Sequence, residues 1–356
     1  MRFQSATSAR SPSRTAGVVL FLLAGLGAPA LLSAAPEPAA GSARPTLSVD
    51  AVAGALYGSA QEFVYANGYV LSELVWPLQP LFFAGSNATV SWPHGLVLGV
   101  SVRLGIPASV GSMTDSDYLN LFDSSGAFFP ANTARTNLSV HDGFLNGSTT
   151  ADAKIGWRVS EGLRASFQIY GGFKYMDYRW QANNGYRQYP PEWSQWGSNP
   201  FPPPGSLYTP WSASEPKVPF SGPVAIYEQT YTIPLAGIAF GYQLSTVFSL
   251  SGSVSFSPLA SLNDIDQHLL RQLVFYDSVD SCLYVEPEVD ITARVSDHFL
   301  IALGLTYLQI TSPKDGNTIE LDTTTNMTRP YAGSGGWGAG GGIQTYGATL
   351  TFRVSF

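Results

Sequence analysis

The sequence is poor in charge and has a single cysteine. Only 12% of its 356 residues are Asp, Glu, Lys or Arg, about half the share that is usual in a soluble protein. Cys282 stands alone, so no internal disulfide can form, and we interpret it as a small apolar filler. The 18 basic residues are outnumbered by 25 acids, which argues against the positive face that nucleic-acid binding requires.

Long hydrophobic runs are also scarce, and one stands near the N-terminus. Residues 16–32 are almost entirely apolar and follow three arginines, Arg2, Arg10 and Arg14. This order predicts a signal peptide over residues 1–35, cleaved between positions 34 and 43, with an uncleaved anchor as the alternative. No later stretch approaches the ~20 apolar residues of a spanning helix. We therefore expect residues 44–356 to be a single exported domain that is either soluble or crosses a membrane as strands.

The rest of the chain alternates with a period of two residues. In residues 248–256, Phe and Val alternate with Ser, and residues 299–307 and 346–356 repeat the pattern with Gly and Thr. A soluble β-sandwich alternates in the same way. Here, however, the second face is small and polar, which suits the lumen of a membrane barrel better than a packed core.

The connections between these segments favour a barrel as well. Tight links at 93–95, 160–162, 245–246 and 296–298 alternate with long segments at 105–137, 183–220 and 313–342. Outer-membrane barrels have short turns on one side and long loops on the other. We predict an all-β fold, a ten-stranded antiparallel transmembrane β-barrel whose strands extend above the outer membrane. The expected strands are 45–66, 69–92, 95–104, 138–159, 163–182, 220–244, 247–263, 270–295, 299–311 and 343–356.

Acidic residues and one histidine gather at the predicted upper ends of three strands. Glu62 is near the top of the first strand; Asp115 and Asp117 follow the third; Asp264, Asp266 and His268 follow the seventh. Residues two apart on a strand share a face. The clusters are therefore expected to meet at the mouth of the barrel.

The seventh strand presents a difficulty of register. Phe248, Val254 and Phe256 have even numbers and should face lipid, and the same parity would turn His268 outward. We therefore predict a bulge or bend between Pro258 and Leu262 that resets the facing. No such correction is expected for the first and third strands.

The three clusters suggest hydrolytic chemistry. His268 beside Asp266 can act as a general base, and Asp115 with Asp117 can hold a water. Glu62 and Asp264 would then bind a guanidinium or ammonium group. A calcium site is an alternative, but histidine is a poor calcium ligand, and zinc would require more His or Cys, so we predict no metal. A hydrolase, a cation-selective channel and an adhesin remain open on these residues alone.

At these positions the sequence resembles the omptin family of outer-membrane endoproteases. Residues 62–76, "EFVYANGYVLSELVW", are similar to the family's first hairpin, and "GSMTDSDY" at 111–118 resembles its paired-aspartate motif. "NDIDQH" at 263–268 ends in the family's Asp-x-His motif, and "DGNT" at 315–318 is also similar. The resemblance implies a vase-shaped, ten-stranded barrel with its active site in an extracellular groove.

Roles follow from the resemblance residue by residue. Asp266 and His268 match the catalytic dyad, Asp115 and Asp117 the aspartate couple, and Glu62 and Asp264 the pocket for a basic side chain, with Met113 beside it. The implied function is a monomeric outer-membrane endopeptidase that cleaves peptides and proteins after Arg or Lys, at dibasic sites, on the extracellular side. A catalytically silent barrel of this fold, acting as an adhesin, is the alternative.

One feature of the family is not matched. Its members depend on lipopolysaccharide held by basic and polar residues of the outer wall. The corresponding places hold Tyr175, Asp177 and Thr230. We therefore expect outer-membrane lipid around the barrel but predict no cofactor and no dependence on lipopolysaccharide.

Overall fold

A computed structural model describes residues 44–121, 133–162, 164–194, 206–330 and 337–356. The predicted signal peptide and its cleavage interval lie outside the described residues. None of the described residues forms a helix with the length and hydrophobicity that crossing a membrane requires. The two short 3₁₀ helices are η1 (Leu119–Leu121) and η2 (Pro191–Ser194).

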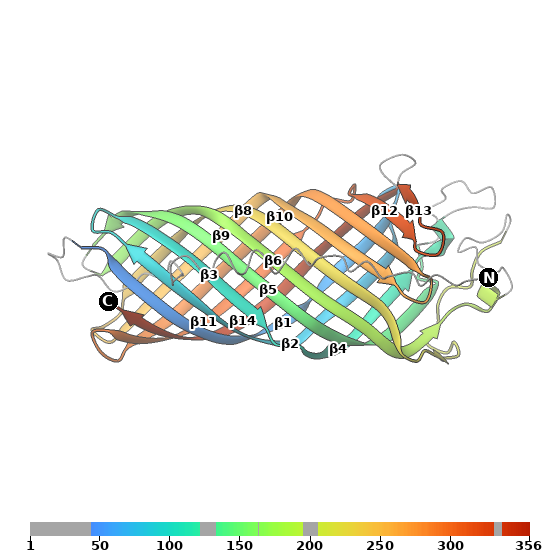
Figure 1. The fold of residues 1–356 in the computed structure, drawn as a ribbon, viewed down its shortest axis with the longest axis horizontal. Helices are drawn as coiled ribbons and strands as arrows, with labels where there is room; N and C mark the ends of the chain where they lie inside the picture. Colours follow the sequence, from blue (N-terminus) through green and yellow to red (C-terminus); the bar gives the residue numbers. More distant parts are fainter. Residues whose placement is uncertain (1–43, 122–132, 163, 195–205, 331–336) are drawn as a thin grey trace, which may run out of the picture.

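The described strands form one antiparallel sheet that closes on itself (Figure 1). Closure comes from the pairing of β10 with β11, which joins the two ends of the strand order. The predicted ten-stranded barrel is thus confirmed. Its strands are β1 (Thr46–Ala66), β2 (Tyr69–Ser91), β3 (Leu96–Gly105), β5 (Asn137–Glu161), β6 (Ala165–Gln188), β8 (Pro223–Gln243), β9 (Phe248–His268), β10 (Leu273–Arg294), β11 (Phe299–Thr311) and β14 (Trp337–Ser355).

Four further strands extend the wall at the end of the barrel away from the tight turns. β4 (Ala108–Asp117) pairs with β2 and β5, and β7 (Val218–Pro219) pairs with β6. β12 (Asn317–Asp322) pairs with β10 and, through a hairpin, with β13 (Met327–Pro330). The segments predicted as long loops at 105–137 and 313–342 therefore contain strands that raise the rim.

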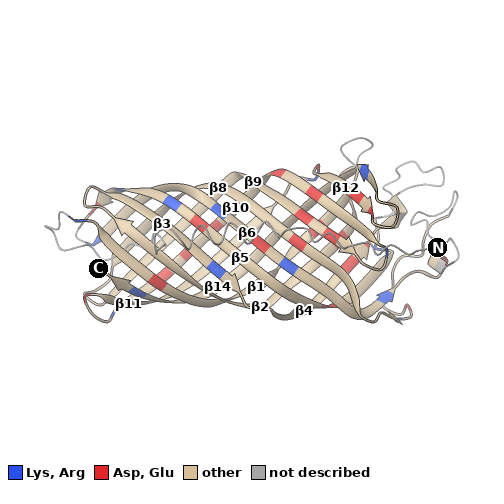
Figure 2. Cartoon of the chain, viewed as in Figure 1, with Lys and Arg blue, Asp and Glu red and all other residues tan. Residues whose placement is uncertain are grey.

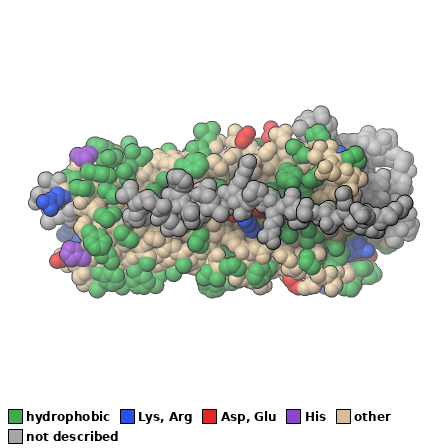
Figure 3. Space-filling model, in the orientation of Figure 1, with side chains coloured by type: hydrophobic (Ala, Val, Ile, Leu, Met, Phe, Trp, Pro, Cys, Tyr) green, Lys and Arg blue, Asp and Glu red, His purple; other side chains and the backbone are tan. Residues whose placement is uncertain are grey.

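Outward-facing apolar side chains form a band on the part of the barrel near the tight turns. On β8 the outward residues Ile238, Phe240 and Tyr242 are exposed, whereas Glu228 and Thr230 take the same outward positions farther along. The space-filling view shows hydrophobic side chains on this part of the wall (Figure 3). A lipid-facing band of this kind spans the membrane, so the upper ends of β1, β4, β9 and β10 project beyond it.

The register prediction for the seventh strand is confirmed. On β9, the odd-numbered residues up to Ser257 are buried or half-buried, and Pro258 and Leu259 are both exposed. From Ala260 to Asp266 the even-numbered residues are buried, and His268 is half-buried. The pairing with β8 shifts at the same place: Thr232 pairs with Ser261 and Ala236 with Phe256, so four residue steps on β8 match five on β9. The extra residue forms a bulge, and Asp264, Asp266 and His268 consequently turn inward with Ala260.

The prediction that the third strand needs no correction was wrong. Ser101 is buried on β3, but Val110, of opposite parity, is buried on β4 beyond the break at 106–107. A second irregularity between Ser109 and Gly111, where Gly111 has φ of +108°, restores the original parity before Met113. Asp115 and Asp117 keep their predicted facing because the two interruptions cancel.

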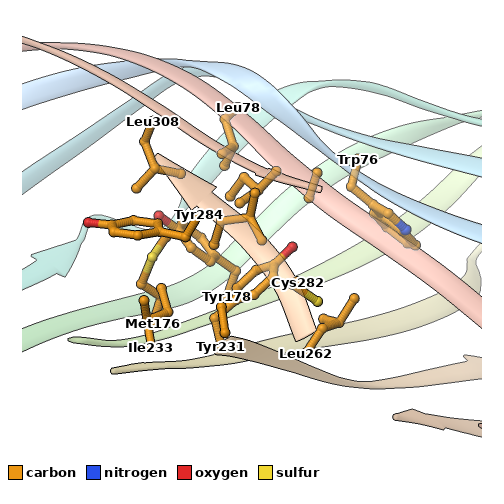
Figure 4. Close-up of a cluster of buried hydrophobic side chains, with 14 of the residues drawn as sticks. Trp76, Leu78, Met176, Tyr178, Tyr231, Ile233, Leu262, Cys282, Tyr284 and Leu308 are labelled. Atoms are coloured by element: carbon orange, nitrogen blue, oxygen red, sulfur yellow. The ribbon is translucent and has the colours of Figure 1, made fainter. Parts of the chain in front are cut away.

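The middle of the lumen is filled by large side chains. Trp76, Tyr178, Trp180 and Tyr227 are almost fully buried, and the rings of Trp76 and Tyr227 stack with centroids 5.2 Å apart. Below them, Tyr231, Tyr284, Met176 and further apolar residues close the interior (Figure 4). This packed layer is a floor for the site above it and argues against an open cation-selective channel.

Candidate active site

The predicted site residues come together at one end of the barrel. Leu74 on β2 pairs on one side with Glu62 of β1 and on the other with Asp115 of β4, so these two acids lie at the same height. Acidic residues gather in the half of the barrel toward β4 and β12 (Figure 2). The charge of His268 lowers the pKa of Asp115, and the charge of Asp266 raises the pKa of Glu62. The end of β9 therefore faces both acids.

His268 and Asp266 form the predicted pair at the end of β9. Nε2 of His268 contacts Oδ2 of Asp266, whose side chain is 1% exposed, and the two form an ion pair whenever the imidazole is protonated. The edge of the Phe275 ring packs against the imidazole, with centroids 5.3 Å apart at 82°. The buried carboxylate and the aromatic contact hold the ring in one orientation.

Arg271 is a further member of the site that was not predicted from the sequence. It lies in the turn after β9, and its Nη2 donates to Nδ1 of His268 at 2.5 Å. The same Nη2 also lies 3.1 Å from Nε2. Because the Asp266 carboxylate can only accept, the proton on Nε2 points to Asp266, which leaves Nδ1 as the nitrogen that accepts from Arg271. Nδ1 is therefore the nitrogen with a lone pair for proton transfer. The spacing of three residues from His268 was the signal available in the sequence.

Asp115 and Asp117 lie partly buried on the opposite wall, on one face of β4. Burial raises the pKa of Asp115, and the charges of His268 and Arg271 lower it in part. Burial, followed by the charge of Asp115, raises the pKa of Asp117 to about 7. Because the charge of Asp115 acts on Asp117, the two carboxyl groups titrate as a pair, and together they can hold a water.

Glu62 and Asp264 lie in a buried cluster with a third acid, Asp277, and these three residues are called the acidic pocket below. One carboxylate oxygen from each of the three lies within 4.8 Å of the others, and the residues are 3%, 3% and 4% exposed. Burial raises the pKa of Glu62 and of Asp264, and neighbouring acids raise both further. Among the described residues, this is the group whose oxygens could hold a cation.

Hydrogen bonds fix Asp264 within the pocket. Tyr227 donates to Oδ2 of Asp264 at 3.2 Å, and Nε2 of Gln229 donates to the Tyr227 hydroxyl at 2.9 Å. Gln229 also donates to the carbonyl of Gln61, next to Glu62, at 3.2 Å. The sequence reading did not include Tyr227, Gln229 or Asp277, because their place depends on cross-strand register.

Met113 and His141 are buried near the site. Met113 is 1% exposed in the apolar cluster and pairs across strands with His141. Both ring nitrogens of His141 are hydrogen-bonded, Nδ1 with the carbonyl of Asn184 at 2.6 Å and Nε2 with Ser139 Oγ at 3.0 Å. The role of Met113 beside a substrate side chain stays a prediction.

The outer wall at the predicted lipid positions is polar. Thr230 donates to Asp177 at 3.3 Å, and Arg179, also on the outer face of β6, is ion-paired with Asp177 at 3.2 Å and with Glu228 at 3.3 Å. One basic residue therefore stands at this place, held between two acids. The prediction that the protein needs no lipopolysaccharide is not decided by this arrangement.

Comparisons with known proteins agree with the fold. The chain is 23% identical over 338 residues to the plasminogen activator of Yersinia pestis, covering 92% of this chain and 96% of the relative. The outer membrane protease OmpT of Escherichia coli has the same fold, with a TM-score of 0.70 at 19% identity, covering 87% of this chain and 97% of that one. The model of the omptin family matches residues 43–353. The chain therefore belongs to the omptin family.

Proposed function

We propose that the protein is an outer-membrane endopeptidase that cleaves peptide bonds after basic residues. Membership of the omptin family and the similarity to an outer membrane protease and a plasminogen activator support protease function. The observation that carries the proposal is the ion pair of His268 with Asp266, which faces Asp115 across the barrel mouth. A nucleophile from the protein is not required if water is activated by this arrangement.

The reaction begins with a water held between the aspartate couple and His268. As Nδ1 of His268 takes a proton, the water oxygen attacks the carbonyl carbon of the substrate. Asp266 stabilises the imidazolium that forms. The C–N bond then breaks, and His268 returns the proton to the leaving amine. For the water to reach Nδ1, the Arg271 guanidinium must leave its contact with that nitrogen.

The acidic pocket supplies specificity for a basic side chain. The neighbouring charges that act most strongly on Glu62 and Asp264 are those of other acids, and they raise the pKa of both groups. A lysine or arginine side chain would provide the missing positive charge through charge-assisted hydrogen bonds. Substrates with two successive basic residues are the natural first choice.

The site lies beyond the apolar band, at the end of the barrel away from the tight turns. In outer-membrane barrels the short turns face the periplasm, so we place the site on the extracellular side. We further propose that residues 1–35 are removed on export and that the barrel works as a monomer. N-terminal sequencing of protein from outer membranes tests the first point, and its mass in detergent tests the second.

Cleavage of a quenched fluorescent peptide with a central Arg-Arg tests the function. Refolded residues 44–356 should cleave it with or without lipopolysaccharide, and His268→Ala and Asp115→Asn should abolish cleavage. His298→Ala, in a tight turn at the other end, is the matched control and should retain it. If a folded barrel cleaves nothing in either lipid condition, an adhesin becomes the better account of the fold.

A further inference from the structure

Asp277 adds a third carboxylate to the pocket that the proposed function assigns to Glu62 and Asp264. It lies directly opposite Asp264 in the pairing of β10 with β9, and opposite Thr318 in the pairing of β10 with β12. A hydrogen bond from Thr318 stabilises the ionised carboxylate. Asp277 is thus fixed by strands on both sides, with its side chain turned into the pocket.

The pocket has acceptors without donors. Glu62 Oε2, Asp264 Oδ1 and Asp277 Oδ1 have no hydrogen-bond partner among the described residues, although the three side chains are nearly inaccessible to water. Beside them, Oε1 of the fully buried Gln229 likewise has no partner there. Buried acceptors left in this state are costly, so the arrangement is complementary to a cation that brings several N–H groups.

We propose that the pocket is built for a primary ammonium, so that the enzyme prefers lysine over arginine before the scissile bond. The inference rests on the proposed function and names the side chain that the pocket accepts. An ammonium has three donors in tetrahedral directions. Three hydrogen bonds of about 2.8 Å from one nitrogen place their acceptors about 4.6 Å apart, which fits three carboxylate oxygens within 4.8 Å of one another.

A guanidinium fits this triangle less well. Its donors lie in one plane and form a fork that matches the two oxygens of a single carboxylate. These donors are spread over three nitrogen atoms, whereas the three carboxylate oxygens lie within 4.8 Å of one another, a span that matches the donors of a single nitrogen. Arginine is therefore expected to bind two of the acids and to leave the third buried without a partner.

Paired peptides that differ only in Lys or Arg before the cut give the test. Wild-type protein should have the higher kcat/KM for the lysine peptide, and the difference should persist in EDTA. Asp277→Asn should reduce the ratio of lysine to arginine kcat/KM by about tenfold, as expected for the loss of one charge-assisted hydrogen bond. Asp280→Asn is the matched control, since Asp280 is exposed on the same strand.

A wild-type preference for arginine, or an unchanged ratio in Asp277→Asn, overturns the inference. So does an effect of EDTA on the ratio, because the pocket would then hold a metal ion. If neither peptide is cleaved, the proposed function fails and binding decides the inference separately. n-Butylammonium should then raise the unfolding temperature of the wild type more than n-butylguanidinium does, and Asp277→Asn should remove that difference; equal shifts would count against the ammonium pocket.

Discussion

Asp266 and His268 are ion-paired inside the barrel mouth although the lower half of their strand points residues of the same parity into lipid. The pair exists because the bulge at Pro258 and Leu259 changes the facing of β9. Asp266 is buried against the Nε2 side of the ring, while Nδ1 is directed toward Arg271. The carboxylate thus sets the tautomer and leaves the other nitrogen for proton transfer.

We expect Asp266→Asn to lower kcat strongly and KM little. The amide cannot stabilise the imidazolium, and it can favour the wrong tautomer, an effect that lowers kcat by about 10⁴-fold in a comparable dyad. Steady-state kinetics on the Arg-Arg peptide measures the split. Asp264→Asn should instead change mainly KM if Asp264 binds the substrate side chain as proposed. Equal effects of both variants on kcat would contradict the division of roles.

Arg271→Gln should shift the acidic limb of the pH profile of kcat/KM to higher pH. The guanidinium lowers the pKa of Asp115 and of Asp117, so its removal raises both, and the couple then ionises only at higher pH. Arg294→Gln, at the far end of β10, is the control and should leave the profile in place. An unchanged profile in Arg271→Gln would show that the guanidinium does not act on the couple.

Much of this arrangement is predictable from the sequence, for local reasons. Alternation with a period of two residues predicts the strands. Even-numbered residues of β9 are apolar before Pro258 and include the site residues after it, so a bulge between them is required. The convergence of Glu62, Asp115 and Asp266 follows from their places at the upper ends of strands. These features follow from the alternation of side chains along a strand and from the lengths of the connections, and both can be determined from the sequence.

The remaining features depend on which residues become neighbours across strands. Asp277 joins the pocket because it pairs with Asp264, and a shift of one residue would turn it outward. β4 was missed because Pro107 interrupts the third strand and the residues that follow are small and weakly alternating. Arg271 lies in a turn, where strand periodicity gives no direction to a side chain.

Asp277→Asn should make the barrel more resistant to unfolding above pH 7. Burial raises the pKa of Asp277 to about 7, above the value of about 4 for an unfolded aspartate. The folded state therefore binds the extra proton between these values, and stability falls as pH rises from about 4 to about 7. Unfolding temperatures at both ends of this range should differ less in the variant, and Asp280→Asn should behave as the wild type. A variant with the same pH dependence as the wild type would count against this ionisation.

The pairing of the first strand with the last gives a prediction about stability. Arg353 on β14 donates two hydrogen bonds to Asp50 on β1, at 2.7 and 2.8 Å, and both side chains are buried. Arg353→Met should destabilise the fold by about 3–5 kcal/mol, because it leaves a buried carboxylate unpaired. The double variant Asp50→Asn, Arg353→Met should recover part of the loss. Denaturant unfolding in detergent measures both, and a double variant no more stable than the single one would contradict the explanation.

Deleting Leu259 tests the bulge itself. With one residue fewer, β9 continues without a change of facing, so Phe256 stays outward and His268 turns outward with it. The barrel should still form, as seen by its heat-dependent mobility in electrophoresis, but activity should fall to the level of His268→Ala. Leu259→Ala keeps the extra residue and should remain active, which separates the count of residues from the loss of the side chain. Full activity after the deletion would mean that the strand regains its register elsewhere and that the bulge does not determine the site.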